Sequence, residues 1–157
     1  MSVKFKVDDR VAKRLVKRIS RLSKKGLEVG VLASKGGNKE YRNGSTVLEV
    51  AAVHEFGSPE NGIPRRSFIQ STLESASVKR EQARLSSRVA AQIIAKHTTV
   101  EKGLAFLGEW AKNKITDRIA GDEIRPALKP ATAKRKGFDN VLVETGKLVD
   151  SIDYEVK

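Results

Sequence analysis

A long stretch without glycine or proline constrains the fold more than any other feature of the sequence. Residues 65–97 contain neither residue, and most of their side chains favour a helical backbone. One helix of about 30 residues would be ~45 Å long, which is long for a chain of 157 residues. Its middle, residues 78–88, has few apolar side chains. We therefore predict a long helix whose middle projects or packs on a neighbour.

The N-terminal part predicts a second helix and then a strand. Asp8 and Asp9 are suitable N-cap residues, and apolar residues follow at spacings of four, four and three, up to a helix end near Gly26. Residues 27–32 have apolar side chains with a period of two, which favours a short strand. Residues 34–45 are rich in Gly, Asn and Lys, so we expect a mobile, solvated loop or a hairpin tip there.

The stretch around residue 50 predicts a short helix. Thr46 and Glu49 have the spacing of a capping box, and Gly57 stands where a left-handed residue would end the helix. A strand is the competing interpretation, because the valines of this stretch are β-branched. The capping residues favour the helix. Residues 58–64 then form a turn-rich connector.

A second capping box predicts the helix that follows the long one. Thr98 and Glu101 would open this helix, and Gly121 would close it. Gly103 and Gly108 lie inside it, where each costs up to ~1 kcal/mol relative to Ala. We expect close packing against these glycines as the compensation.

The C-terminal part completes an α+β domain. Residues 122–140 are rich in Pro, Lys and Ala and are expected to form an extended arm. Thr145 is expected to cap a short helical turn, and residues 152–156 alternate as a final strand. The sequence thus predicts a single domain over residues 1–157. It would hold a small, mostly antiparallel sheet packed against two or three helices, one of them long, with an extended loop and an arm.

The net charge of +12 is unevenly distributed. Residues 1–25 contain ten Lys or Arg against two Asp, a local sum of +8, whereas residues 141–157 sum to −2. Such polarity suits nucleic acid at one end or head-to-tail contact between copies of the chain, and a solvated basic face is the third interpretation. The candidate contacts to DNA or to an acidic partner are Lys13, Arg14, Lys17, Arg18, Arg21 and Lys24.

The composition offers little for a cofactor. The chain has no cysteine, which excludes disulfides and thiolate metal sites, and its only histidines, His54 and His97, form no HExxH motif. The glycine-rich stretches match neither nucleotide-binding loop. The first residues lack the apolar run of a secretory signal, so we expect none, and no apolar run approaches the ~18 residues of a membrane span. We expect no cofactor, no metal and no membrane contact.

His54 and Glu55 allow two interpretations: an acid–base pair, or hydrogen-bonding residues that fix the following turn. Neighbours on a helix point about 100° apart, so this pair does not easily form a shared catalytic unit. Ser67 and Ser71 lack the surroundings of a nucleophile elbow. We therefore favour the structural interpretation and predict that the chain is not an enzyme.

Arg65 and Arg66 follow Pro64 at the predicted start of the long helix, where a cation opposes the helix dipole. Two interpretations are open for this placement. The arginines pair with Glu55 or Glu60 inside the molecule, or they contact carboxylates of a partner.

Residues 51–74, AAVHEFGSPENGIPRRSFIQSTLE, resemble the signature of a tailed-phage family known as tail-completion, tail-component or virion-morphogenesis proteins. The family pattern is an alanine-rich helix, His/Asn-Glu-Phe-Gly, a short loop, Ile-Pro-x-Arg-x-Phe and a long helix. Arg66 occupies the usual arginine position, and Ser67 replaces a proline. The matching positions are Ala51, Ala52, His54, Glu55, Phe56, Gly57, Ile63, Pro64, Arg65 and Phe68.

A second block supports the resemblance. LKPATAKRKG, followed by LVETGKLVDSIDYEV, is similar to the carboxyl end of that family, where Leu-x-x-Thr-Gly-x-Leu precedes a strand. The two blocks come in the family order and cover both halves of the chain. The residues that carry the second block are Leu142, Thr145, Gly146, Leu148 and Ser151.

The resemblance implies a small structural α+β subunit at the head–tail junction. Such subunits form rings, here a six-membered ring in the virion, and the purified subunit is expected to be a monomer or a ring in solution. The implied partners are head-completion or connector proteins and tail-terminator or tail-tube proteins, with non-specific contact to genomic DNA. The chain would reside in the host cytoplasm during assembly and in the virion afterwards. The rival interpretation is a basic, non-specific nucleic-acid-binding protein.

A compact corner is expected to fix the angle between the short helix and the long one. Gly57 would turn the chain because glycine tolerates positive φ, and a charge pair between Glu55 and Arg66 would hold the corner. The apolar residues of this corner would be Phe56, Ile63, Pro64 and Phe68.

Overall fold

The computed structural model describes residues 9–121, 124–127, 134, 142 and 146–157, and it confirms the α+β class. Two antiparallel strands pack against several helices, of which α4 and α5 are long. The helices are α1 (Asp9–Leu22), α2 (Val47–Phe56), α3 (Gln70–Leu73), α4 (Ala76–Ile94), α5 (Val100–Ala120) and α7 (Lys147–Asp150), and the strands are β1 (Leu27–Val31) and β2 (Ile152–Val156). Short 3-10 turns cover Ala33–Lys35 and Pro59–Asn61.

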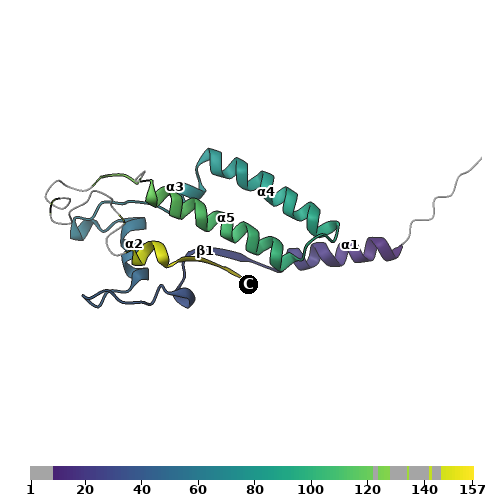
Figure 1. Ribbon diagram of the computed structural model, residues 1–157, viewed down its shortest axis with the longest axis horizontal. Coiled ribbons are helices and arrows are strands. Elements are labelled where there is room, and N and C mark those ends of the chain that lie inside the picture. The colour runs from purple at the N-terminus through teal and green to yellow at the C-terminus, as the bar shows by residue number, and fades with distance from the viewer. Residues whose placement is uncertain (1–8, 122–123, 128–133, 135–141, 143–145) are drawn as a thin grey trace, which may run out of the picture.

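The sheet joins residues 27–31 to residues 152–156, near the C-terminal end of the chain. β1 pairs antiparallel with β2, so that Leu27 faces Val156 and Val31 faces Ile152. Beyond the strands, Gly26 and Lys157 exchange two backbone hydrogen bonds of 2.8 and 2.9 Å. The acidic C-terminal strand therefore lies near the end of the basic helix α1, so these two segments of opposite charge are not at opposite ends of the molecule (Figure 1).

Helix α5 organises the packing. It lies along both strands, and α4 packs on it from the outer side (Figure 1). The main core contains Phe68, Ile115, Ile119 and Ile152, all fully buried. A smaller apolar cluster joins α4 and α5; its buried members are Val89, Ile93 and Val100.

The two glycines inside α5 have the close contacts that we expected. A Cβ at Gly108 would overlap the ring of Tyr154, and one at Gly103 would come within 2.7 Å of Val89 Cγ1. The absence of a side chain lets a strand and a neighbouring helix approach the α5 backbone. Packing thus offsets the low helix propensity of glycine.

The prediction of one helix over residues 65–97 is wrong. The chain is helical from Gln70 to Leu73, breaks, and is helical again from Ala76 to Ile94. Ser75 causes the break, because its backbone is extended and its Oγ accepts a hydrogen bond from the N–H of Val78 as an N-cap. The helix bounds at α5 also shift by one residue: Thr99, not Thr98, caps it by accepting from the N–H of Lys102.

Other expected boundaries agree with the structure or lie outside its described part. Residues 47–56 are helical with a complete capping box, so the strand interpretation is wrong. α1 ends at Leu22, four residues before Gly26. In the predicted loop at 34–45, Tyr41 and Ser45 form a hydrogen-bonded turn. Of the predicted arm at 122–140, the described residues 124–127 touch the body, and Ile124 joins the core. Most of the arm lies outside the described residues.

Candidate functional site

The corner between α2 and α3, residues 54–70, is the candidate site. α2 ends at Gly57, whose N–H donates to the carbonyl oxygen of Val53. Gly57 has φ +81°, and a Cβ there would lie 2.9 Å from the backbone nitrogen of Arg65. Both the left-handed backbone and the close approach require glycine at this turn. A bridge between Ser58 and Ile63 then closes the connector.

Glu55 connects α2 to the start of α3. Its Oε2 accepts from the backbone N–H groups of Phe68 and Ile69 at 2.8 and 2.9 Å. Its Oε1 accepts from Ser67 Oγ at 2.6 Å and from the N–H of Gln70 at 3.0 Å. The buried carboxylate thus supplies the acceptors that the first turn of a helix lacks.

The hydrogen bonds determine the ionisation of Glu55. Burial by itself would raise the pKa of this carboxyl group, but the bonds from Ser67 and from three backbone N–H groups outweigh burial and hold the pKa below its ordinary value. Glu55 is therefore an anion at neutral pH with both oxygens occupied. Such a group is a poor general base, because accepting a proton would break bonds that hold the corner.

The predicted charge pair between Glu55 and Arg66 is absent among these described side chains. The guanidinium of Arg66 instead donates to the carbonyl oxygens of Pro126 and Ala127 at 2.9 and 3.3 Å. Arg66 is buried, and its backbone N–H donates to the carbonyl oxygen of His54 at 2.7 Å. Arg66 therefore ties the corner to residues 124–127.

The predicted hydrophobic corner is also wrong. Of its four residues only Phe68 is in the core, whereas Phe56 is 71% exposed. Ile63 is half-buried and Pro64 is exposed. Residues 47, 51 and 55 form the buried face of α2, and Phe56 lies one position beyond it, on the outer face. Polar contacts of Glu55 and Arg66, rather than apolar packing, hold the corner.

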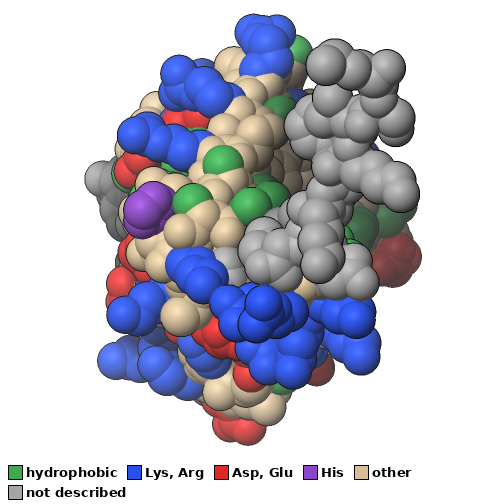
Figure 2. All heavy atoms as spheres, turned by 90° about the vertical axis from the view of Figure 1, so that its right-hand side faces the viewer, with side chains coloured by type: hydrophobic (Ala, Val, Ile, Leu, Met, Phe, Trp, Pro, Cys, Tyr) green, Lys and Arg blue, Asp and Glu red, His purple; other side chains and the backbone are tan. Residues whose placement is uncertain are grey.

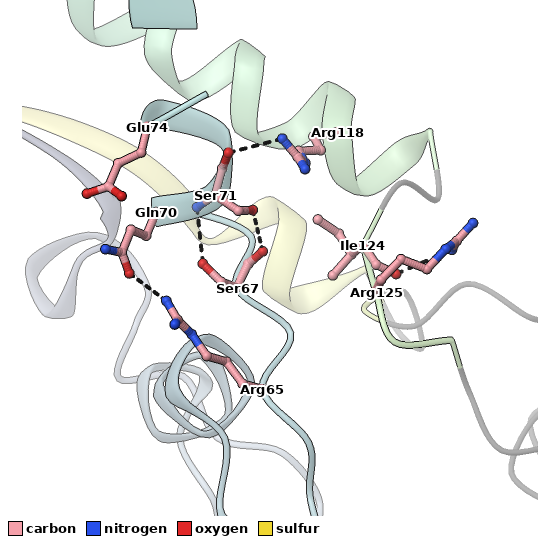
Figure 3. Close-up of a pocket in the computed structure, with 8 residues that line it drawn as sticks. All are labelled: Arg65, Ser67, Gln70, Ser71, Glu74, Arg118, Ile124 and Arg125. Atoms are coloured by element: carbon pink, nitrogen blue, oxygen red, sulfur yellow. Dashed lines mark hydrogen bonds between the residues drawn. The ribbon is translucent and has the colours of Figure 1, made fainter. Parts of the chain in front are cut away.

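A polar pocket of about 550 Å³ lies between the corner and the end of α5 (Figure 3). Arg65 donates from Nε to the carbonyl oxygen of Glu55 at 3.0 Å and from its terminal nitrogen to Gln70 Oε1 at 2.6 Å. Across the pocket Arg118 donates to the carbonyl oxygen of Ser71 at 3.1 Å. Because these acceptors are neutral, neither Arg65 nor Arg118 forms an ion pair within the described residues. Glu74 also lines the pocket and contributes a carboxylate.

The other predicted site residues lie apart from this corner. Gly146, with φ +74°, precedes α7, and Leu148 is buried in the main core. Thr145 lies outside the described residues. Lys13, Arg14, Lys17 and Arg21 are exposed on α1, and Lys24 is exposed just after it. Lys and Arg cover much of the surface at the α1 end of the molecule (Figure 2). The side chain of Arg18 is not described.

Two features of the site escaped the sequence analysis. The first is the hydrogen bond that Ser67 donates to Glu55. The sequence indicated only that Ser67 stands where the resembling family has a proline and that it lacks a nucleophile elbow. Leu48, Ala52 and Phe56 form an exposed apolar stripe along α2, at a spacing of four residues that the sequence already contained.

The described residues were also compared with the requirements of a metal site and of a membrane span. No group of three His, Asp or Glu side chains there is placed to hold a metal ion. None of the described helices is long and apolar enough to cross a bilayer. Comparisons of the chain with protein-family models, with curated proteins and with solved structures gave no match.

Proposed function

We propose that the chain is a structural subunit of the head–tail junction of a tailed phage. It assembles as a ring around the DNA channel, joins the filled head to the finished tail and performs no catalysis. The resemblance of residues 51–74 and of the C-terminal block supports the junction function. The hydrogen bonds of Glu55 support the part of the proposal that excludes catalysis by this corner. Both carboxylate oxygens of Glu55, the candidate acid–base residue of the block, accept hydrogen bonds from donors of the same chain.

The contacts of the corner suit a structural subunit, because they fix the orientation of segments relative to one another. Glu55 fixes α3 relative to α2, and Arg66 fixes the corner relative to residues 124–127. These contacts connect segments that are far apart in the sequence. A junction subunit needs such a rigid joint, because its neighbours in a ring must meet at one fixed angle.

Removal of the protein from the phage that encodes it tests the proposal. We expect electron micrographs to show filled heads and complete tails that remain separate. Purified wild-type protein should join them, and so should Gly44→Ala, whose added Cβ meets no atom within 4 Å. Gly57→Val should fail to join them. Particles that join normally without the protein would refute the junction function.

A non-specific nucleic-acid-binding protein is the second candidate, and the exposed basic side chains of α1 favour it. Phosphate contacts of this kind release counterions, so the affinity for duplex DNA should fall steeply with salt. We would compare a variant with Lys13, Arg14, Lys17 and Arg21 changed to Gln with a variant of equal charge in which Lys79, Arg80, Arg84 and Arg88 are changed. Light scattering with short duplexes gives stoichiometry. Equal loss of affinity in both variants would contradict a specific role of α1.

A further inference from the structure

The outer face of α2 is apolar and uncovered. Phe56 is 71% exposed and Leu48 is 38% exposed, and the exposed Ala52 lies between them at helical spacing. The buried face of the same helix, formed by residues 47, 51 and 55, lies about 100° around the helix from this stripe. α2 therefore has two apolar sides, and only one of them has a partner within the described chain.

Helix α1 has the same property at another place in the molecule. Val16 is 66% exposed and Ile19 is 51% exposed, although α1 touches α4. Lys13, Lys17 and Arg21 are exposed on the adjoining face. A helix with an uncovered apolar stripe and a basic border fits a partner whose apolar surface has an acidic border.

The segment that contains α2 supplies acidic side chains for that border, and the exposed Arg65 follows it. Residues 47–64 contain three Glu and no Lys or Arg, in a chain whose net charge is +12. Residues 9–22 of α1 contain six Lys or Arg and one Asp. Among the carboxylates near α2, Glu55 is buried, whereas Glu49 and Glu60 are exposed. Each of these two already accepts a hydrogen bond within the molecule, Glu49 from Thr46 and Glu60 from Ser58, and each keeps its negative charge towards solvent. The two exposed apolar faces thus carry opposite charge.

The two faces lie towards opposite ends of the molecule, so one copy does not bring them together. In Figure 1, α1 extends at one end of the long axis, and α2 lies towards the other end. We infer that α1 of one copy packs on α2 of a second copy, with Val16 and Ile19 against Leu48 and Phe56. The inference rests on the ring of the proposed function and names the surfaces through which its subunits would meet.

Charge argues for this pairing over a symmetric one. Two α1 helices in contact would bring twelve Lys or Arg side chains together, because each contributes six. Two α2 segments would bring like carboxylates together in the same way. Only the pairing of α1 with α2 sets opposite charges around both apolar stripes, and it leaves a free α1 and a free α2 at the ends. Such a contact is heterologous and repeats until a ring closes.

The absence of cysteine from the chain allows a direct test by disulfide cross-linking. Full-length V16C and F56C proteins would be mixed in equal amounts and mildly oxidised at the highest soluble concentration. A disulfide forms only where the two Cβ atoms approach to about 4 Å. F106C is the matched control partner for V16C, because Phe106 is an aromatic residue of α5 that is 54% exposed.

We expect the V16C–F56C product to exceed the V16C–F106C product at least fivefold. The double variant V16C/F56C should give a ladder of covalent oligomers on a non-reducing gel. Equal yields with both partners, no product, or a predominance of V16C–V16C dimers would overturn the inference.

Failure of this contact can be separated from failure of the junction function. If wild-type protein joins heads to tails but V16C and F56C do not cross-link, the contact is wrong and the junction proposal stands. If wild-type protein does not join them, the junction proposal is wrong, whatever the cross-linking yields.

Discussion

Replacing Glu55 with Gln tests the proposed role of the corner most directly, because the change keeps the size of the side chain and removes its charge. In the wild type each carboxylate oxygen accepts two hydrogen bonds. An amide has one oxygen and one NH₂ group, so only one of these pairs of donors can keep its acceptor. The variant should fold, because the core residues around the corner are unchanged.

The expected loss of stability follows from how the amide can turn. Its oxygen best serves the N–H groups of Phe68 and Ile69, the more buried donors, and its NH₂ group then faces Ser67 and Gln70. Each of the two retained bonds loses the charge-assisted part of its strength, about 1 kcal/mol, and the lost bond from Gln70 costs about another 1 kcal/mol. The hydroxyl of Ser67 adds no further loss, because it can rotate and accept a hydrogen bond from the new NH₂ group. We expect the free energy of unfolding to fall by about 3 kcal/mol, a large share of the roughly 5–15 kcal/mol that is usual for a domain.

Urea titration followed by the fluorescence of Trp110, the only tryptophan, measures this loss. The midpoint should shift while the m-value stays constant. Glu74→Gln is the matched control, because Glu74 is exposed in the same segment and its carboxylate bonds to no described residue. A loss for Glu55→Gln no greater than for Glu74→Gln would refute the reasoning.

The pH dependence gives a second check on the same variant. Because the pKa of Glu55 in the folded protein lies below the ordinary 4.5, its stabilisation is present above that pH and is lost as the pH falls through the folded pKa. The stability difference between the wild type and Glu55→Gln should therefore stay constant at higher pH and narrow below 4.5. A difference that widens towards acid would contradict the assignment of a charged Glu55.

Three further changes extend the test to other contacts, each measured by the same titration. Gly57→Val should cost at least about 2 kcal/mol, because it adds a clash with the backbone to a strained φ, whereas Gly44→Ala, which has a similar φ but open space, should cost only about 1 kcal/mol. Gly108→Ala should destabilise by about 1–3 kcal/mol through displacement of Tyr154, despite the better helix propensity of alanine; a stabilised variant would contradict the close packing. Arg66→Met should cost about 2 kcal/mol, because two carbonyl groups lose a charged donor; an unchanged midpoint would mean that water replaces the guanidinium.

Local signals in the sequence predicted most of the elements. The capping box at Thr46 and the closing Gly121 predicted helix ends correctly, because these residues act on backbone groups within one turn. The break at Ser75 was missed, since serine is tolerated inside helices and no glycine or proline marks the site. Whether Ser75 caps a new helix depends on the direction that α4 must take to pack on α5.

The candidate site was predictable in its position but not in its contacts. The sequence pattern identified residues 54–68 as a corner, but the partners of Glu55 and Arg66 come from segments whose approach depends on the whole fold. Opposite charges close together in the sequence suggested a pair, yet backbone N–H groups at a helix start and carbonyl groups near residue 126 attract the same side chains. The spacing of charged residues in the sequence does not reveal that backbone N–H and carbonyl groups compete for the same side chains.

The pairing of β1 with β2 has a consequence for how a newly made chain matures. Residues 27–31 emerge from the ribosome early, and their only described partner strand, residues 152–156, emerges much later. Meanwhile the nascent α4–α5 hairpin has all its mutual contacts within a short stretch and can form first. Pulse-labelled hydrogen exchange should therefore protect amides of α5 before those of β1. Simultaneous protection would mean that the sheet itself nucleates folding.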